Sequence, residues 1–146
     1  KLSEGVAQAT FLAMAGLNRL QMTDVPRTPI AVEDMLPAVA QGAIGIERRA
    51  DDGRVAEMLA AIHDGPTGLR LAAERAFLRA LDGSCQTPIG GLAELDGGNL
   101  RLRGEILRID GSEVLTDDAS APVADGPAMA VDMAKALLGR AGPAFF

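Results

Sequence analysis

The chain has 146 residues, of which 48% are hydrophobic and only 3% aromatic, with no Trp or Tyr, so its core must come from aliphatic side chains and Met. A formal net charge of −6 argues against general attraction to nucleic acid or to an anionic membrane surface. No apolar run reaches the roughly 20 residues of a membrane span, and no signal pattern is visible at the N-terminal end. We therefore expect a cytoplasmic α/β or α+β protein.

The first half of the sequence predicts one βα unit and one further strand and helix. Residues 6–20 begin like a buried strand and continue as an Ala-rich helix, and the prolines of residues 23–30 predict an extended connector. Residues 43–47 are short and apolar enough for a returning strand. A helix is expected from Asp51, because apolar residues recur at helical spacing after it. We place a domain boundary where that helix ends, at residues 63–66.

The second half predicts a helix, a three-stranded meander and a last helix. The first helix follows Thr67, which suits an N-cap position, and Asp82-Gly83 ends it. Asp-Gly-Gly-Asn and Asp-Gly signals separate three strand-like runs. The runs cover residues 87–95, 100–109 and 112–117, and the last helix covers about 127–138. The expected fold class is α+β, with helices on one face of a three-stranded antiparallel sheet.

Cys85 is the only cysteine of the chain and lies in a Gly/Ser loop between polar neighbours. A single Cys cannot form an internal disulfide, and with one His it cannot complete a zinc site, so no metal is expected. A buried, inert thiol is the commonest role of a lone Cys. A catalytic thiolate is favoured by a helix N-terminus or a His partner, and Cys85 has neither in sequence. An accessible but unactivated thiol suits a sulfur that reacts once and stays bonded.

The segment around this thiol, "ERAFLRALDGSCQTPIG" (residues 74–90), resembles the cofactor-attachment signature of the porphobilinogen deaminase (hydroxymethylbilane synthase) family. Three other segments are similar to further parts of the same family. They are "AMAGLNRL", "MLPAVAQGAIGIERRADD" and "AELDGGNLRLRGEILRIDGSEV". The resemblance thus covers essentially the whole chain and places it in the C-terminal part of that enzyme.

This resemblance implies a transferase of tetrapyrrole, porphyrin and heme biosynthesis. The family condenses four porphobilinogen molecules into hydroxymethylbilane and releases ammonia at each step. The product grows on a dipyrromethane cofactor that is joined to the protein through a thioether, for which the resemblance implies Cys85. The expected partners are porphobilinogen and the polypyrrole intermediates, together with the N-terminal half of the enzyme, and the full enzyme is expected to be a monomer that binds neither nucleic acid nor a membrane.

The family motifs also imply binding residues for the carboxylate-rich polypyrrole. Arg19 would bind acetate and propionate groups, beside the backbone around Ala13 and Gly16, because a guanidinium binds carboxylates bidentately. By its residue type alone, Arg19 would be a solvated cation at a helix end. Gln41 corresponds to a family glutamine near the cofactor. The sequence departs from the family at Ala40, usually Gly, which should strain the turn if that position needs a positive φ.

Other charged residues have plainer interpretations. Arg48 stands where many family members have a second Cys, and little consequence is expected. Arg70, Arg75 and Arg79 could form an anion patch, but helical surface charges are more often solvated or paired, so only Arg75 is kept as a weak supporting candidate. We expect Glu74 and Arg75 to anchor the third domain against the others.

The catalytic acid and base of the family belong to a part of the enzyme that this sequence does not contain. We therefore expect no catalytic Asp in this chain, and an isolated chain that is inactive. Residues 1–62 are assigned to the C-terminal part of domains 2 and 1, an incomplete α/β segment, and residues 63–146 to domain 3, which attaches the cofactor. The alternative is a non-catalytic fragment or α+β interaction module that keeps only the fold.

Overall fold

The computed structural model describes residues 1–83, 87–143, 145 and 146. The chain divides into two compact units, Lys1–Met35 and Leu36–Phe146. Within the described residues, no helix is long and apolar enough to cross a membrane.

The first unit contains one short helix, α1 (Met14–Arg19). Gln21 adopts a positive φ of 54°, and the N–H groups of Gln21 and Met22 donate to the carbonyls of Asn18 and Leu17. This Schellman motif fixes the end of the helix. The strand predicted before the helix is not formed, and residues 6–13 are exposed. A strand needs a hydrogen-bonded neighbour, and this unit, all of which the structure describes, has no other strand.

The second unit begins with an irregular segment and α2 (Gly53–Ala60). The predicted helix is confirmed, and the Asp52 carboxylate caps it by accepting the Val55 N–H at 2.9 Å. The strand predicted at residues 43–47 is wrong, because those residues pair with no other strand and Ile44 is 92% exposed.

Helix α3 (Gly65–Ala80) begins three residues earlier than Thr67 would require. Its N-cap is Asp64, whose carboxylate accepts the Thr67 N–H at 2.8 Å and whose pKa is lowered mainly by hydrogen bonding from Thr67. Pro66 lies in the first turn, where its missing N–H costs nothing. The predicted stop is confirmed. Asp82 takes a φ of 53°, and the Gly83 N–H donates to the Leu78 carbonyl.

The three predicted strands form one antiparallel sheet in the order β1-β2-β3. The strands are β1 (Ile89–Asp96), β2 (Asn99–Leu107) and β3 (Val114–Pro122). Positive φ values at Gly97 and Gly111 make the two hairpin turns, as the Asp-Gly signals predict. β3 continues beyond the predicted run, with alternating half-buried and exposed residues.

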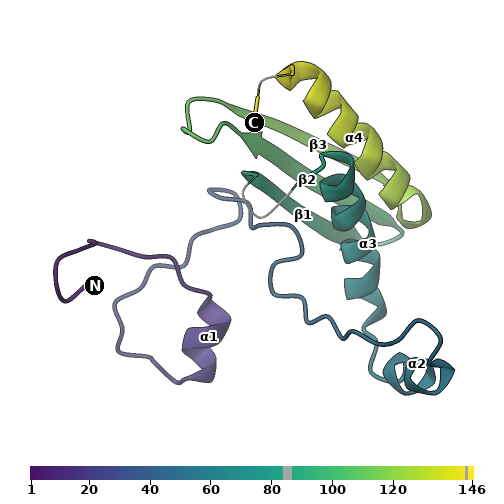
Figure 1. The fold of residues 1–146 in the computed structure, drawn as a ribbon, viewed down its shortest axis with the longest axis horizontal. Helices are drawn as coiled ribbons and strands as arrows, with labels where there is room; N and C mark the ends of the chain where they lie inside the picture. Colours follow the sequence, from purple (N-terminus) through teal and green to yellow (C-terminus); the bar gives the residue numbers. More distant parts are fainter. Residues whose placement is uncertain (84–86, 144) are drawn as a thin grey trace. The chain divides into compact units, whose positions relative to one another are not determined.

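A short 3₁₀ turn, η1 (Val123–Asp125), leads into α4 (Gly126–Ala141). Helices α3 and α4 pack against each other and against the sheet, as Figure 1 shows. Their inner side chains and those of the sheet form the core, whose largest fully buried members are Phe77, Leu100, Leu102, Ile106 and Leu137. The α+β prediction is confirmed.

Candidate functional site

Cys85 lies outside the described residues, but the backbone on either side of it is well anchored. Gly83 lies between Leu78 and Ile89, so closely that a Cβ added there would be 2.6 Å from each side chain. On the other side, the Pro88 carbonyl accepts the Leu107 N–H at 3.0 Å and so binds the chain to β2. The described residues on either side of Cys85 are thus in contact with α3 and hydrogen-bonded to β2.

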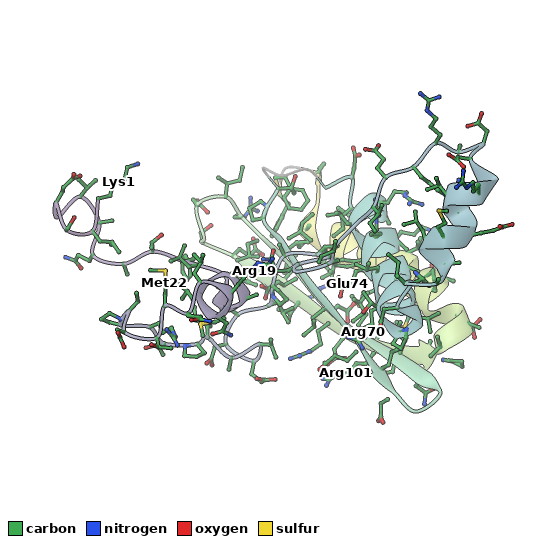
Figure 2. The ribbon with its side chains drawn as sticks, turned by 90° about the horizontal axis from the view of Figure 1, so that it is seen from below. Lys1, Arg19, Met22, Arg70, Glu74 and Arg101 are labelled. Carbon is green, nitrogen blue, oxygen red and sulfur yellow. The ribbon has the colours of Figure 1, made fainter. Side chains whose placement is uncertain are left out.

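Arg19, Ala13 and Gly16 are brought together on α1. The Ala13 carbonyl accepts the N–H groups of Gly16 and Leu17, so Ala13 is the N-cap, while Arg19 is the last helical residue. All three predicted site residues are exposed, and Figure 2 labels Arg19. A cation in the last turn also interacts favourably with the helix dipole. The geometry therefore fits both interpretations of Arg19, as a carboxylate-binding residue and as a solvated cation at a helix end.

Gln41 belongs to the other unit and lies between two residues with left-handed backbone. The Gln41 N–H donates to the Ala38 carbonyl at 3.0 Å, and the Ala43 N–H donates to the Ala40 carbonyl at 3.2 Å. The third residues of these two turns, Ala40 and Gly42, have φ values of 62° and 78°. Such values are typical of type II turns, in which the third position favours Gly. The strain predicted at Ala40 therefore has its geometric basis, and Gln41 itself is exposed.

Glu74 is the buried charged residue next to this turn, with a side chain in the packed face of α3 (Figure 2). One carboxylate oxygen accepts the Ala40 N–H at 2.7 Å, and the other accepts the Ala93 N–H of β1 at 2.8 Å. Two such charge-assisted bonds offset the cost of burying a carboxylate. The sequence predicts Glu74 as an anchor of the third domain against the others, and the bond to Ala40 does join residues 63–146 to residues 1–62. Both contacts lie within the second compact unit.

Replacing Ala40 by glycine is expected to stabilise the chain by about 0.5 kcal/mol, because Gly adopts a positive φ without a Cβ penalty. Ala43→Gly is the matched control. Ala43 lies in the same segment without a positive φ, so its replacement should destabilise the chain. Urea unfolding, monitored by far-ultraviolet circular dichroism, measures the free energy of unfolding of both variants. Equal losses of stability in the two variants would contradict the prediction.

The arginines of α3 do not form a built anion site. All three are exposed, namely Arg70, Arg75 and Arg79. Arg79 lies in the last turn of the helix, where a cation interacts favourably with the helix dipole. The His63 ring lies against the first turn of α3, with Nε2 2.8 Å from where a Gly68 Cβ would be. The contacts therefore favour the interpretation of these arginines as solvated surface charges.

Paired charges cover the face of the sheet opposite the core. Arg101 binds Asp118, and this hydrogen bond is the main reason why the pKa of that carboxyl lies below its usual range. Arg103 binds Glu94 at 3.0 Å. On the same face, burial raises the pKa of Glu105. Because these arginines already bind carboxylates of the chain, the face offers little to an anionic ligand.

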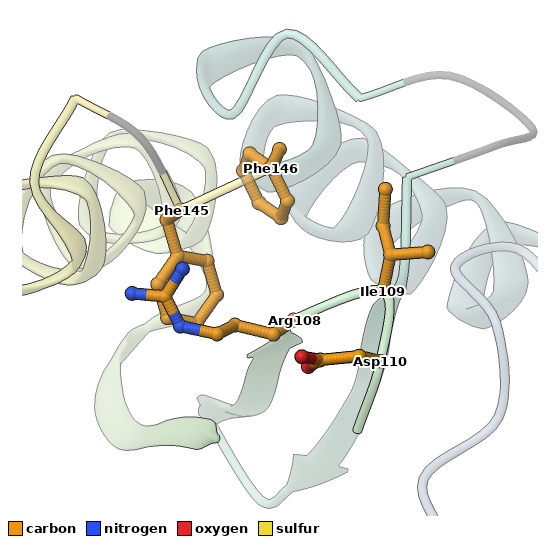
Figure 3. A pocket seen from close by; sticks show the side chains of 5 residues that line it. All are labelled: Arg108, Ile109, Asp110, Phe145 and Phe146. Atoms are coloured by element: carbon orange, nitrogen blue, oxygen red, sulfur yellow. The ribbon is translucent and has the colours of Figure 1, made fainter. Parts of the chain in front are cut away.

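An open hollow of about 300 Å³ lies where the C-terminal residues meet the end of β2 (Figure 3). The Arg108 guanidinium lies over the Phe145 ring, 4.9 Å from its centroid, and Phe146 meets Phe145 edge to face. Arg108 also pairs with Glu113 at 2.9 Å. None of the predicted site residues that the structure describes lines this hollow.

Comparison with known proteins gives the class to which this fold and these turns belong. Residues 69–139 match the family model "Porphobilinogen deaminase, C-terminal domain". Residues 1–57 match the model "Porphobilinogen deaminase, dipyromethane cofactor binding domain". The chain therefore matches two domain types of one family.

Curated relatives agree over the whole chain. A porphobilinogen deaminase of Paracoccus denitrificans is 64% identical over all 146 residues, which make up 47% of that relative. The chloroplastic porphobilinogen deaminase of Pisum sativum is 49% identical, over 40% of its length, and that of Nitrobacter winogradskyi is 46% identical, over 46%. The chain belongs to the porphobilinogen deaminase family, and it spans about half the length of the curated relatives it matches.

The cofactor prediction is confirmed at the level of the domain. Dipyrromethane is the cofactor of the domain type that residues 1–57 match, and Ala13, Gly16, Arg19 and Gln41 all lie within that match. Cys85 and Glu74 lie within the match to the C-terminal domain.

Proposed function

We propose that the chain is the cofactor-carrying part of a hydroxymethylbilane synthase, which condenses four porphobilinogen molecules stepwise and releases ammonia. The observation that carries this proposal is the match of both domain models together with the 64% identical relative. Dipyrromethane, when bound through a thioether to Cys85, supplies the primer on which the pyrrole chain grows. The catalytic acid and base come from residues outside this chain, and the isolated chain is inactive.

The residue types in the two matched regions suit a covalently held, carboxylate-rich group. In the sequence, Cys85 follows α3 and precedes β1, so no helix N-terminus comes next to activate its thiol. Such a thiol suits a stable thioether rather than repeated nucleophilic attack. Arg19 is exposed, always charged and able to bind a carboxylate with two parallel hydrogen bonds. Gln41 is exposed on a turn whose backbone is held in place, so its amide can bind a pyrrole ring or a carboxylate.

The test uses a chimaera in which the chain replaces the segment that it matches in the Paracoccus denitrificans relative. After incubation with porphobilinogen, mass spectrometry should find a dipyrrole adduct on the tryptic peptide of residues 80–101, which contains Cys85. The unaltered relative is the positive control. An active chimaera whose peptide is unmodified would refute the attachment site. An inactive, unmodified chimaera with the native fold would instead favour the non-catalytic module.

Arg19→Lys is expected to weaken the retention of the polypyrrole by about tenfold, because Lys keeps the charge but loses the bidentate fork. The charge at the end of α1 is unchanged, so the stability of the chain should stay the same. The kinetics of the chimaera and thermal unfolding measure the two quantities. If Lys behaves as Arg does and only Arg19→Gln lowers stability, Arg19 is a helix-end cation and not a ligand.

The cellular location is part of the same proposal. We propose a cytoplasmic enzyme, although the Pisum sativum relative carries the name of a chloroplastic protein, so location varies within the family. Fractionation of the source cells with an antibody against the chain tests this point.

A further inference from the structure

We propose that Glu74 is a positioning residue that holds the turn of residues 38–43, and with it Gln41, in the geometry that serves the cofactor. The proposal rests on the proposed function for the ligand of Gln41. Its structural half concerns only Glu74, the turn and β1, which belong to one unit.

Glu74 acts at the point where a neighbouring segment leaves the edge of the sheet. The Gly91 N–H of β1 donates to the Pro37 carbonyl at 2.9 Å, and Ala38 forms an antiparallel bridge with Gly90. The chain then turns away from β1. The next N–H along this edge, that of Ala93, donates to Glu74. One carboxylate oxygen of Glu74 thus accepts the hydrogen bond that a neighbouring strand would accept if it continued along β1.

The other oxygen binds the turn where its backbone is least favourable. This oxygen accepts the Ala40 N–H. Ala40 has a φ of 62°, a backbone conformation that residues with a Cβ rarely adopt. A hydrogen bond to a buried carboxylate offsets this cost. Gln41 follows directly, so the direction in which its exposed side chain leaves the backbone depends on this bond.

The chemistry of a carboxylate is needed here because both partners are donors. A glutamine offers one oxygen, and its amide N–H₂ would face the other N–H group. The Ala93 bond is fully buried, whereas the Ala40 bond is only partly buried. Leaving the more buried N–H unpaired costs more, so Gln should keep the bond to Ala93 and lose the bond to Ala40.

The experiment compares Glu74→Gln with Glu94→Gln, an exposed carboxylate on β1. In Glu74→Gln, the NMR amide resonances of residues 38–43 should shift while that of Ala93 keeps its position. In the chimaera, kcat/KM should fall by about tenfold, the value expected for one charge-assisted hydrogen bond. Adding Ala40→Gly should restore most of the rate, because Gly holds the turn without help. Glu94→Gln should change neither the turn nor the rate.

Several outcomes would overturn the proposal. The first is a change in the amide resonance of Ala93 while those of residues 38–43 stay the same. The second is a change in the resonances of residues 38–43 with an unchanged kcat/KM. The third is a failure of Ala40→Gly to restore kcat/KM. If Glu74→Gln does not fold, hydrogen exchange in the unaltered chain decides the structural half. The Ala40 N–H should then exchange more slowly than that of the exposed Gly42, and equal rates would refute the bond. A failure of the proposed function gives a different result. In that case the chimaera that retains Glu74 is itself inactive and carries no dipyrrole adduct.

Discussion

Replacing Cys85 by serine is expected to abolish the covalent adduct and to lower the activity of the chimaera by at least about 100-fold. Covalent anchoring makes each addition to the growing pyrrole chain effectively intramolecular, and that advantage disappears when the primer can diffuse away. A serine hydroxyl without an adjacent base is a far weaker nucleophile than a thiol, so it does not replace the sulfur. The intact mass of the protein and the rate of hydroxymethylbilane formation measure the two effects.

The matched control is Ser84→Ala, which alters the neighbouring residue and leaves the thiol in place. It should carry the adduct and retain most of the activity. If Cys85→Ser forms hydroxymethylbilane at the rate of the unaltered chimaera, the thioether proposal fails. An adduct that persists in Cys85→Ser would place the attachment at another residue.

Phe77→Ala is expected to destabilise the chain by about 3–5 kcal/mol, the largest loss that we expect from a single core truncation. Phe77 is fully buried on α3 and lies against two glycines of the sheet. A Cβ added at Gly104 would be 2.6 Å from Phe77 Cζ and 2.7 Å from Met133 Cε. The ring thus occupies space that the absence of a side chain at Gly104 leaves open. Because the chain has no Trp or Tyr, circular dichroism in urea is the appropriate measurement.

Leu69→Ala is the control on the same helix, since Leu69 is 45% exposed and its truncation should cost less than about 1 kcal/mol. A second variant checks the reason for the loss. Gly104→Ala should destabilise the chain when Phe77 is present and should do so less in Phe77→Ala, where the ring no longer occupies the space. A loss at Phe77 no larger than that at Leu69 would contradict this account of the core.

Local signals in the sequence predicted the second half of the chain well. Asp-Gly turns, alternating apolar residues and helical spacing led to three strands and two helices in the correct order. The error at the start of α3 arose because Thr67 and Asp64 are both good capping residues. Only the fold shows that the Asp64 carboxylate accepts the Thr67 N–H.

The strands predicted in the first half were wrong for a different reason. Apolar runs such as residues 43–47 have strand character, but a strand exists only when a neighbouring strand pairs with it through hydrogen bonds. Ile44 and Ile46 are exposed, and their segment pairs with no strand. Periodicity alone carries no information about such a partner.

The sequence by itself determined the family, the unique thiol and the candidate ligands Arg19 and Gln41, because these depend on residue types in a recognisable order. It also indicated that Ala40 would be strained if its φ were positive. Only the tertiary structure decided that the φ is positive and that Glu74 links the turn to β1 through Ala93. Those contacts join residues 19 and 34 positions from Glu74, and no local pattern encodes the meeting of distant backbone N–H groups at one buried carboxylate.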